Sequence, residues 1–254
     1  MSGKFIWYEL MTNDREAAAK FYGEVVGWTA KDAGMPDVEY SILSTGDRPV
    51  AGMMVIPKEI CDQAQPGWMG YVEAPDVDAM AQKVEANGGR IARPPEDIPG
   101  VGRFAVVTDT GGAFFCLMRD DNPLGPEPAQ GTPGHVGWRE LNGGNLDADS
   151  RFYADTFGWT YPDRMDMGPL GFYQIFSAGN GAQAGGMMTK MAEAPHPYWL
   201  FYFAVGDIDA AEARIKAAGG TVLHGPMEVP GEDWIIQGQD PEGVMFAVVG
   251  KRAK

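Results

Sequence analysis

The pattern of apolar and polar positions predicts the same order of elements at the start of the chain and again further along. Residues 5–11 read as a strand, and Asn13-Asp14 then precedes a segment whose apolar residues recur at helical spacing. These apolar positions are Ala17, Ala18, Phe21, Tyr22 and Val25. Gly27 ends the predicted helix, and short strands are expected near 28–31, 40–43 and 51–56.

A second segment predicts the same order. Residues 68–73 read as a strand, and Asp76 caps a helix with apolar residues at Val77, Met80 and Val84. Gly88-Gly89 ends this helix, and strands are expected near 89–92, 104–108 and 113–118, with a turn at 109–112 between the last two. One strand, one helix and three strands therefore form the recurring element of the chain.

Both segments return 131 residues later. Trp7, Trp28 and Asp76 correspond to Trp138, Trp159 and Asp207 at this spacing. The other matched positions are Glu9 and Glu140, the Phe-Tyr pairs 21–22 and 152–153, Trp68 and Trp199, Tyr71 and Tyr202, and Gly88-Gly89 and Gly219-Gly220. A repeat this long predicts a tandem duplication of whole domains, at 4–118 and 135–250, joined by a Pro- and Gly-rich linker at 119–134.

Composition and charge narrow the function classes. The chain has 254 residues, of which 35 are glycine, and a net charge of −15. So many glycines favour short strands and tight turns over a helical bundle, and the charge argues against a nucleic-acid partner. Neither Cys61 nor Cys116 is repeated, so no disulfide framework is expected. We find no signal-peptide core and no apolar run of membrane length, and therefore expect a cytoplasmic protein without a membrane partner.

Taken in order, the motifs resemble the vicinal oxygen chelate superfamily, which includes glyoxalases, bleomycin-resistance proteins and extradiol dioxygenases. They are the Phe-Tyr…Gly-Trp helix ends, the helix starts at 76–78 and 207–209, the Gly-Gly helix stops, and the Asp-x-x-Gly turns at 109–112 and 240–243. The resemblance implies an α+β fold of tandem glyoxalase-like domains. In such a fold four βαβββ modules pair into curled, cup-forming mixed sheets.

The resemblance also implies a divalent metal held by residues from three places, namely the first strand, the strand opening the second half, and the last strand. Family members typically place His or Gln, His, and Glu there. In the first copy these places fall on Trp7, Met69 (or Trp68) and Cys116, and in the second on Trp138, Leu200 (or Trp199) and Ala247. These residues do not supply the usual donors, so no metal or other cofactor is expected at the family positions.

The predicted ligand-binding residues are Trp7, Glu9, Met69, Cys116, Trp138 and Glu140. The two glutamates share a strand face with the tryptophans, where they would receive a cationic ligand, act as general bases, or form structural hydrogen bonds. The tryptophans would stack on a planar or cationic ligand or fill the space of a lost metal. No catalytic residue is assigned.

The three histidines, at 135, 196 and 224, all lie in the second copy without ligand-like spacing. We expect them to be loop or surface residues, with His224 just after a strand. His135, together with Glu140, is the best candidate for a rebuilt metal site.

Two functions from different classes remain open. The first is metal-free binding or sequestration of a small aromatic or cationic molecule by a monomer or homodimer, as the likeness to bleomycin-resistance proteins implies. The second is an enzyme, a lyase or isomerase with a displaced metal or acid–base chemistry by the glutamates. A further possibility is that one copy only completes the barrel of the other, which leaves a single working pocket. Fold-level likeness does not decide among them.

Overall fold

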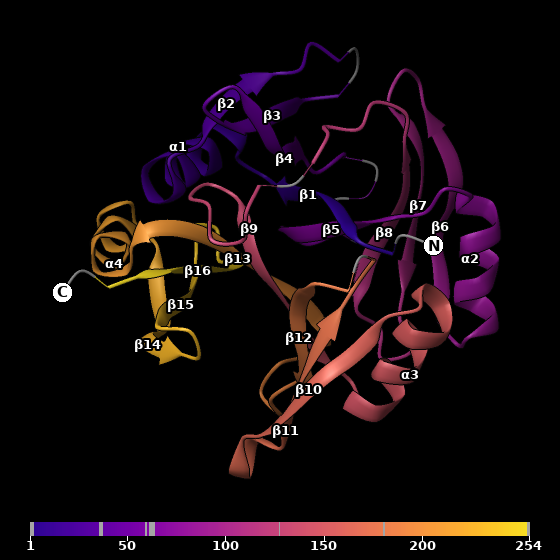
Figure 1. The fold of residues 1–254 in the computed structure, drawn as a ribbon. Coiled ribbons are helices and arrows are strands. Elements are labelled where there is room, and N and C mark those ends of the chain that lie inside the picture. The colour runs from indigo at the N-terminus through magenta and orange to yellow at the C-terminus, as the bar shows by residue number, and fades with distance from the viewer. Residues whose placement is uncertain are drawn as a thin grey trace. The chain divides into compact units, whose positions relative to one another are not determined.

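A computed structural model of the chain describes residues 3–35, 38–58, 60, 64–126, 128–179 and 181–252. Cys61 lies outside the described residues. The order strand, helix, three strands occurs four times, as the sequence pattern predicts, and each occurrence is called a module (Figure 1).

The four modules have the following bounds. The first comprises β1 (Phe5–Thr12), α1 (Arg15–Val26), β2 (Thr29–Asp32), β3 (Tyr40–Thr45) and β4 (Arg48–Val55). The second comprises β5 (Gly67–Glu73), α2 (Val77–Ala86), β6 (Arg90–Ile98), β7 (Gly102–Thr108) and β8 (Phe114–Asp120). The third comprises β9 (Val136–Gly143), α3 (Leu146–Phe157), β10 (Thr160–Asp166), a 3₁₀ turn (Gly168–Leu170), β11 (Phe172–Ser177) and β12 (Gln183–Thr189). The fourth comprises β13 (Tyr198–Asp207), α4 (Ile208–Ala217), β14 (Thr221–Val229), β15 (Asp233–Gln239) and β16 (Met245–Lys251).

The strands form two eight-stranded mixed sheets. Their orders are β2-β3-β4-β1-β5-β8-β7-β6 and β10-β11-β12-β9-β13-β16-β15-β14. Each module pairs its first and last strands in parallel, as β9 pairs with β12 and β13 with β16. The other neighbouring strands of a module pair antiparallel, as β10 pairs with β11 and β11 with β12. The α+β class, the βαβββ modules and the open mixed sheets are thereby confirmed.

The helix limits follow from local chemistry. Asp14, Asp76 and Asp207 each accept a hydrogen bond from the backbone N–H three residues on, which confirms their prediction as helix caps. Asn145 does the same for α3. Gly27 ends α1 with a φ of 90°, a left-handed conformation that disfavours other residues.

Contacts divide the chain into two compact units that do not follow chain order. Unit 1 contains the chain up to Ile6, Met69–Gly125 and Arg139–Trp199. Unit 2 contains Trp7–Trp68, Pro126–Trp138 and the chain from Leu200. Each unit therefore combines segments from both copies of the repeat.

Unit 2 contains a buried group of hydrogen bonds, which we call its interlock. The Tyr22 hydroxyl donates to Oδ2 of Asp240 at 3.1 Å and accepts from Nε1 of Trp68 at 2.8 Å. Nε1 of Trp28 donates to the Gly134 carbonyl at 2.8 Å. Burial and the Asp240 charge raise the pKa of Tyr22 well above its usual value, so this hydroxyl stays a donor.

Unit 1 contains an interlock of the same design. The Tyr153 hydroxyl donates to Oδ2 of Asp109 at 3.1 Å and accepts from Nε1 of Trp199 at 3.2 Å. Nε1 of Trp159 donates to the Gly3 carbonyl at 2.8 Å. Every one of these residues lies 131 positions from its counterpart in unit 2. The repetition of these residues is thus explained by the internal structure of the units.

A helix-to-helix contact is repeated as well. In unit 1, Nζ of Lys83 on α2 donates to the Thr156 carbonyl near the end of α3, at 2.7 Å. In unit 2, the Arg214 guanidinium on α4 donates to the Val25 carbonyl near the end of α1, at 3.1 Å. A cation at a helix C-terminus satisfies carbonyls that lack intrahelical partners.

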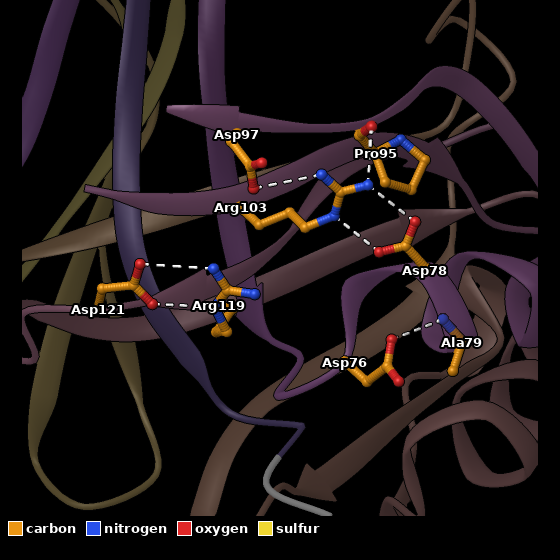
Figure 2. A network of polar contacts seen from close by, with 8 residues as sticks. All are labelled: Asp76, Asp78, Ala79, Pro95, Asp97, Arg103, Arg119 and Asp121. Carbon is orange, nitrogen blue, oxygen red and sulfur yellow. Dashed lines mark hydrogen bonds and ion pairs between the residues drawn. The ribbon is translucent and has the colours of Figure 1, made fainter. Parts of the chain in front are cut away.

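The surface of unit 1 carries a polar network where α2 packs against β6, β7 and β8 (Figures 1 and 2). Arg103 binds both carboxylate oxygens of Asp78 at 2.7 and 2.8 Å and also contacts Asp97 at 3.2 Å. In unit 2 the counterpart of Asp78 is Asp209, which Arg252 binds at 2.8 Å. The same helix start is bound by an arginine on β7 in unit 1 and by an arginine directly after β16 in unit 2, so this network is structural in both units.

None of the helices within the described residues is both long and apolar enough to cross a membrane.

Candidate functional site

The six predicted ligand-binding residues divide between the two units. Unit 2 contains Trp7, Glu9 and Trp138, each half-buried, on β1 and β9. Unit 1 contains Met69, Cys116 and Glu140 on β5, β8 and β9. Their role in ligand binding stays a prediction.

Met69 and Cys116 are in contact in unit 1. The Cys116 thiol lies 3.1 Å from Sδ of Met69, in hydrogen-bonding geometry. Cys116 is only 1% exposed, on a strand where it pairs with Tyr71 of β5. A thiol in this position packs as a small apolar side chain.

The family positions do not fit a divalent metal of the usual kind. Leu200 and Ala247 are buried apolar residues in unit 2, and the alternative choices Trp68 and Trp199 both belong to the interlocks. Of the family positions, only Cys116 and Met69 carry a donor atom, and sulfur suits softer metals than the His and Glu set binds. No three His, Cys, Asp or Glu side chains gather closely enough to hold a metal anywhere in the described part of the chain.

The histidines correspond only partly to the prediction. His196 is exposed in a loop, as expected. His224 is exposed too, but it lies within β14, so its prediction just after a strand was wrong. The strand is longer than its apolar residues suggest because its pairing with β15 continues through polar and proline positions as far as Val229. His135 is half-buried directly before β9, with Nδ1 3.2 Å from the Pro133 carbonyl.

The cluster around Tyr173 in unit 1 brings together residues from three neighbouring strands. Gly186 on β12 lies opposite Glu140 on β9, and Tyr173 comes from β11 on the other side of β12. A Cβ atom at Gly186 would lie 2.1 Å from Cζ of Tyr173, so the ring occupies the space that glycine leaves open. The Tyr173 hydroxyl thereby reaches across β12 and donates to Oε2 of Glu140 at 3.0 Å.

Glu140 has a second donor from its own strand. Nδ2 of Asn142 lies 3.3 Å from Oε1 of Glu140, and the two side chains are 6% and 7% exposed. Burial, followed by the Glu140 charge, raises the pKa of Tyr198. Glu140, Asn142, Tyr173, Gly186 and Tyr198 are called the tyrosine cluster of unit 1.

Unit 2 has a tyrosine cluster built on the same plan from Trp7, Glu9, Tyr40 and Gly52. Glu9 on β1 lies opposite Gly52 on β4, and a Cβ atom at Gly52 would lie 1.8 Å from the Tyr40 hydroxyl oxygen. Here the hydroxyl accepts a hydrogen bond from Nε1 of Trp7 at 3.2 Å. The two clusters therefore share their backbone design, and Asn142 gives Glu140 an amide donor that the side chain of Met11, at the corresponding position of the first copy, does not have.

Sequence reasoning missed both tyrosines. Tyr40 and Tyr173 are 133 positions apart, and Gly52 and Gly186 are 134 apart, so a search at the fixed spacing of 131 does not align them. The Gly-Met-Met runs at 52–54 and 186–188 carry the signal that would have found them.

The likeness to known proteins matches this architecture. The sequence model of the Glyoxalase/Bleomycin resistance protein/Dioxygenase superfamily matches residues 4–117 and again residues 132–248. The chain belongs to this superfamily. The resemblance inferred from the sequence motifs is thereby confirmed, with one match in each copy of the repeat.

Two relatives match nearly the full length of the chain. A protein of Mycobacterium bovis (strain ATCC BAA-935 / AF2122/97) named "Putative glyoxylase CFP32" is 32% identical over 96% of this chain and 93% of its own. "Anthracycline biosynthesis protein DnrV" of Streptomyces peucetius is also 32% identical, over 97% of this chain and 92% of its own.

Among solved structures, the Mn(II)-bound glyoxalase from Novosphingobium aromaticivorans has the same fold. The likeness has a TM-score of 0.70 at 16% identity and covers 99% of this chain and 83% of the other. At so low an identity the likeness concerns the fold alone.

Proposed function

We propose that this superfamily member binds a small aromatic or cationic organic molecule and does so without a divalent metal at the superfamily's positions. The observation that carries this proposal is the side chains at those positions. Tryptophan replaces the first donor in both copies, and the other places hold Met69, Cys116, Leu200 and Ala247. Apolar side chains with a few polar anchors are what a small-molecule site generally contains.

The aromatic part of the proposal rests on two supports. Trp7 and Trp138 are half-buried, so part of each indole is available for contact with a planar ring. In addition, one relative bears the name of an anthracycline biosynthesis protein, and anthracyclines are planar, fused-ring molecules. We therefore choose an anthracycline as the first probe.

The test combines elemental analysis with ligand titration. Purified protein should contain no stoichiometric Zn, Ni, Fe or Mn, and doxorubicin should quench its tryptophan fluorescence with the same Kd before and after treatment with EDTA. The proposal fails if the protein carries one of these metals and a chelator removes it together with binding, or if doxorubicin does not bind.

Acid–base catalysis is the second candidate, because Glu140 is a buried carboxylate held by a tyrosine hydroxyl. A positioned glutamate of this kind is suited to proton abstraction. On this alternative, Glu140→Gln abolishes turnover in a glyoxalase assay while the fold stays intact. Absence of turnover in the unaltered protein removes the alternative and leaves the binding function standing.

A further inference from the structure

An edge strand of unit 2 carries a histidine and a methionine in contact. β14 is the last strand of its sheet (Figure 1). On this strand, Nε2 of His224 lies 3.2 Å from Sδ of Met227. His224 is exposed and Met227 is 40% exposed, so both side chains are accessible from solvent.

An irregular register places these two side chains on one face of the sheet. In a regular strand, residues three apart point to opposite faces. Here His224 pairs with Gln237 of β15. Met227 pairs with Ile235, and the register shifts between the two pairs. Gln237 and Ile235 are two apart and share a face, so the residues opposite them share it as well. Strand irregularities of this kind re-aim side chains.

The first copy has the same irregularity with a different pair of residues. At the spacing of 131, the counterparts are Arg93 and Glu96 on β6, again with a register shift between them. Nη2 of Arg93 and Oε1 of Glu96 form an ion pair. In unit 1 the irregularity thus joins opposite charges, whereas in unit 2 it joins an imidazole and a thioether.

The imidazole and the thioether attract each other only weakly. A thioether sulfur is a weak hydrogen-bond acceptor and has no donor. The neutral imidazole has one unprotonated nitrogen with a lone pair, and the sulfur has lone pairs too, so both groups can bind one cation. Thioether sulfur selects Cu(I) among the common metal ions, and imidazole suits copper as well.

We propose that His224 and Met227 form a binding site for a soft monovalent cation of the Cu(I) type on the edge strand of unit 2. This site goes beyond the proposed function, because neither residue is among the predicted ligand-binding residues or at the superfamily's metal positions.

The preference for a soft monovalent ion follows from the number and kind of donors. Cu(I) and Ag(I) form stable complexes with two ligands, whereas Mg²⁺, Ca²⁺ and Mn²⁺ require several oxygen ligands. Met227 has three rotatable bonds and is exposed, so its sulfur can move away from the imidazole to admit an ion between them. The net charge of −15 favours a cation over an anion.

The experiment is a titration with Ag(I), which shares the ligand preferences of Cu(I) and is stable in air. It uses the full chain with Cys61→Ser and Cys116→Ala in a chloride-free buffer, so that no thiol competes for the ion. With methyl-labelled methionine, we expect the ε-methyl signal of Met227 and the ring signals of His224 to shift together in NMR spectra. Zn²⁺ should leave the Met227 methyl signal in place, because a thioether is too soft a ligand for it.

Variants of the pair give the affinity test. Met227→Leu and His224→Gln should each raise the Kd for Ag(I) at least about tenfold, because loss of one donor removes the gain from binding both at once. The matched control is Met191→Leu, since Met191 is another exposed methionine, and it should leave the Kd unchanged. The double variant His224→Arg/Met227→Glu installs the ion pair of the first copy, and it should stay folded by circular dichroism and lose the site.

The inference is overturned if the His224 and Met227 signals do not shift together. It is overturned equally if either single variant binds Ag(I) as tightly as the parent, or if Met191→Leu weakens binding to the same extent. None of these outcomes involves doxorubicin, so the proposed function is tested separately.

Discussion

The interlocks and the tyrosine clusters differ in how closely their two copies agree. In the interlocks, Tyr22 and Tyr153 make the same hydrogen bonds to Asp240 and Asp109 and receive the same tryptophan donors. In the clusters, the Asn142 amide donates to Glu140, whereas Met11 stands at the corresponding position of the first copy and its side chain has no donor.

The difference separates two kinds of repeated residue. An interlock stabilises its unit only if every buried polar group has a hydrogen-bond partner. Both copies therefore keep the same hydrogen-bonding residues. A cluster on a sheet face requires only that a ring lie over a glycine, which leaves the residues around it free to differ between copies. Agreement between copies therefore indicates structure here, and divergence indicates where to look for function.

The largest effect is expected from removing an interlock carboxylate. Oδ1 of Asp109 accepts from the backbone of Gly111, Gly112 and Ala113, and Oδ2 accepts from Tyr153. Asp109→Ala should lower the free energy of unfolding by about 3 kcal/mol or more, since several buried donors lose their acceptor.

Urea denaturation followed by circular dichroism measures this change, with the exposed Asp97→Ala as a control. Asp240→Ala should cost a similar amount, because its interlock has the same design. A loss for either variant no larger than that of the control would contradict the structural role of the interlocks.

A smaller effect is expected from Gly186→Ala, which tests the cluster of unit 1. The added Cβ would meet Cζ, Cε1 and the hydroxyl of Tyr173 within 2.2 Å, so the ring must move and Glu140 loses a donor. We expect a loss of about 1–3 kcal/mol in the free energy of unfolding.

Gly52→Ala should cost less, because the nearest atom is the hydroxyl at the far end of the half-buried Tyr40 side chain. Chemical denaturation of both variants makes the comparison. Adding Tyr173→Ala to Gly186→Ala should remove the steric part of the loss. If the two glycine variants are equally destabilised, the clusters are energetically alike.

The smallest effect is a pH dependence to which the neighbouring carboxyls Asp109 and Asp149 of unit 1 contribute. Burial, followed by the Asp149 charge, raises the pKa of Asp109 to about 6 from an ordinary value of 3.8. The folded state therefore binds a proton on the Asp109 carboxyl more tightly than the unfolded state does. The contribution of this protonation to stability is present at low pH and is lost as the pH rises through about 6. Stability should therefore increase on going from pH 7 to pH 5, by roughly 1–2 kcal/mol.

Asp149→Asn is the variant that sharpens this prediction. It removes the like charge, while an amide can still bond to Asn145 and Thr110, the present partners of Asp149. Ala18 stands at this position in the first copy, so unit 2 has no counterpart of this carboxylate. Urea midpoints at pH 5 and pH 7 should differ less in Asp149→Asn than in the unaltered protein. An unchanged difference would mean that the two carboxylates do not interact.

Most of the architecture is readable from the sequence because its causes are local. Helix starts at Asp14, Asp76 and Asp207 follow from side chains that bond backbone three residues away, and Gly27 ends α1 through its own conformation. Apolar and polar residues alternate along the strands, and short windows of sequence detect this pattern. However, β6 and β14 extend well beyond their apolar residues. Pairing with a neighbouring strand, rather than sequence, sets those lengths.

The candidate site was predictable only in part. Glu140 could be named from its place on a strand beside Trp138, since side chains two apart share a face. The same rule could have named Asn142, which is two residues after Glu140 on the same strand. Tyr173 could not be named, because its contact with Glu140 depends on strand register and on the open space over Gly186.

By itself, the sequence determined the duplication, the four βαβββ modules, the helix caps, and the replacement of the family's metal donors by Trp7, Met69, Cys116 and their counterparts. Each of these features follows from the identity of single residues or from their spacing along the chain. Only the tertiary structure decided that Tyr22, Trp28, Trp68 and their counterparts belong to interlocks joining segments from both copies. It also decided that Tyr173, which is 33 residues away in the chain, contacts Glu140. Both outcomes depend on contacts between residues far apart in the chain, which packing selects and local pattern does not record.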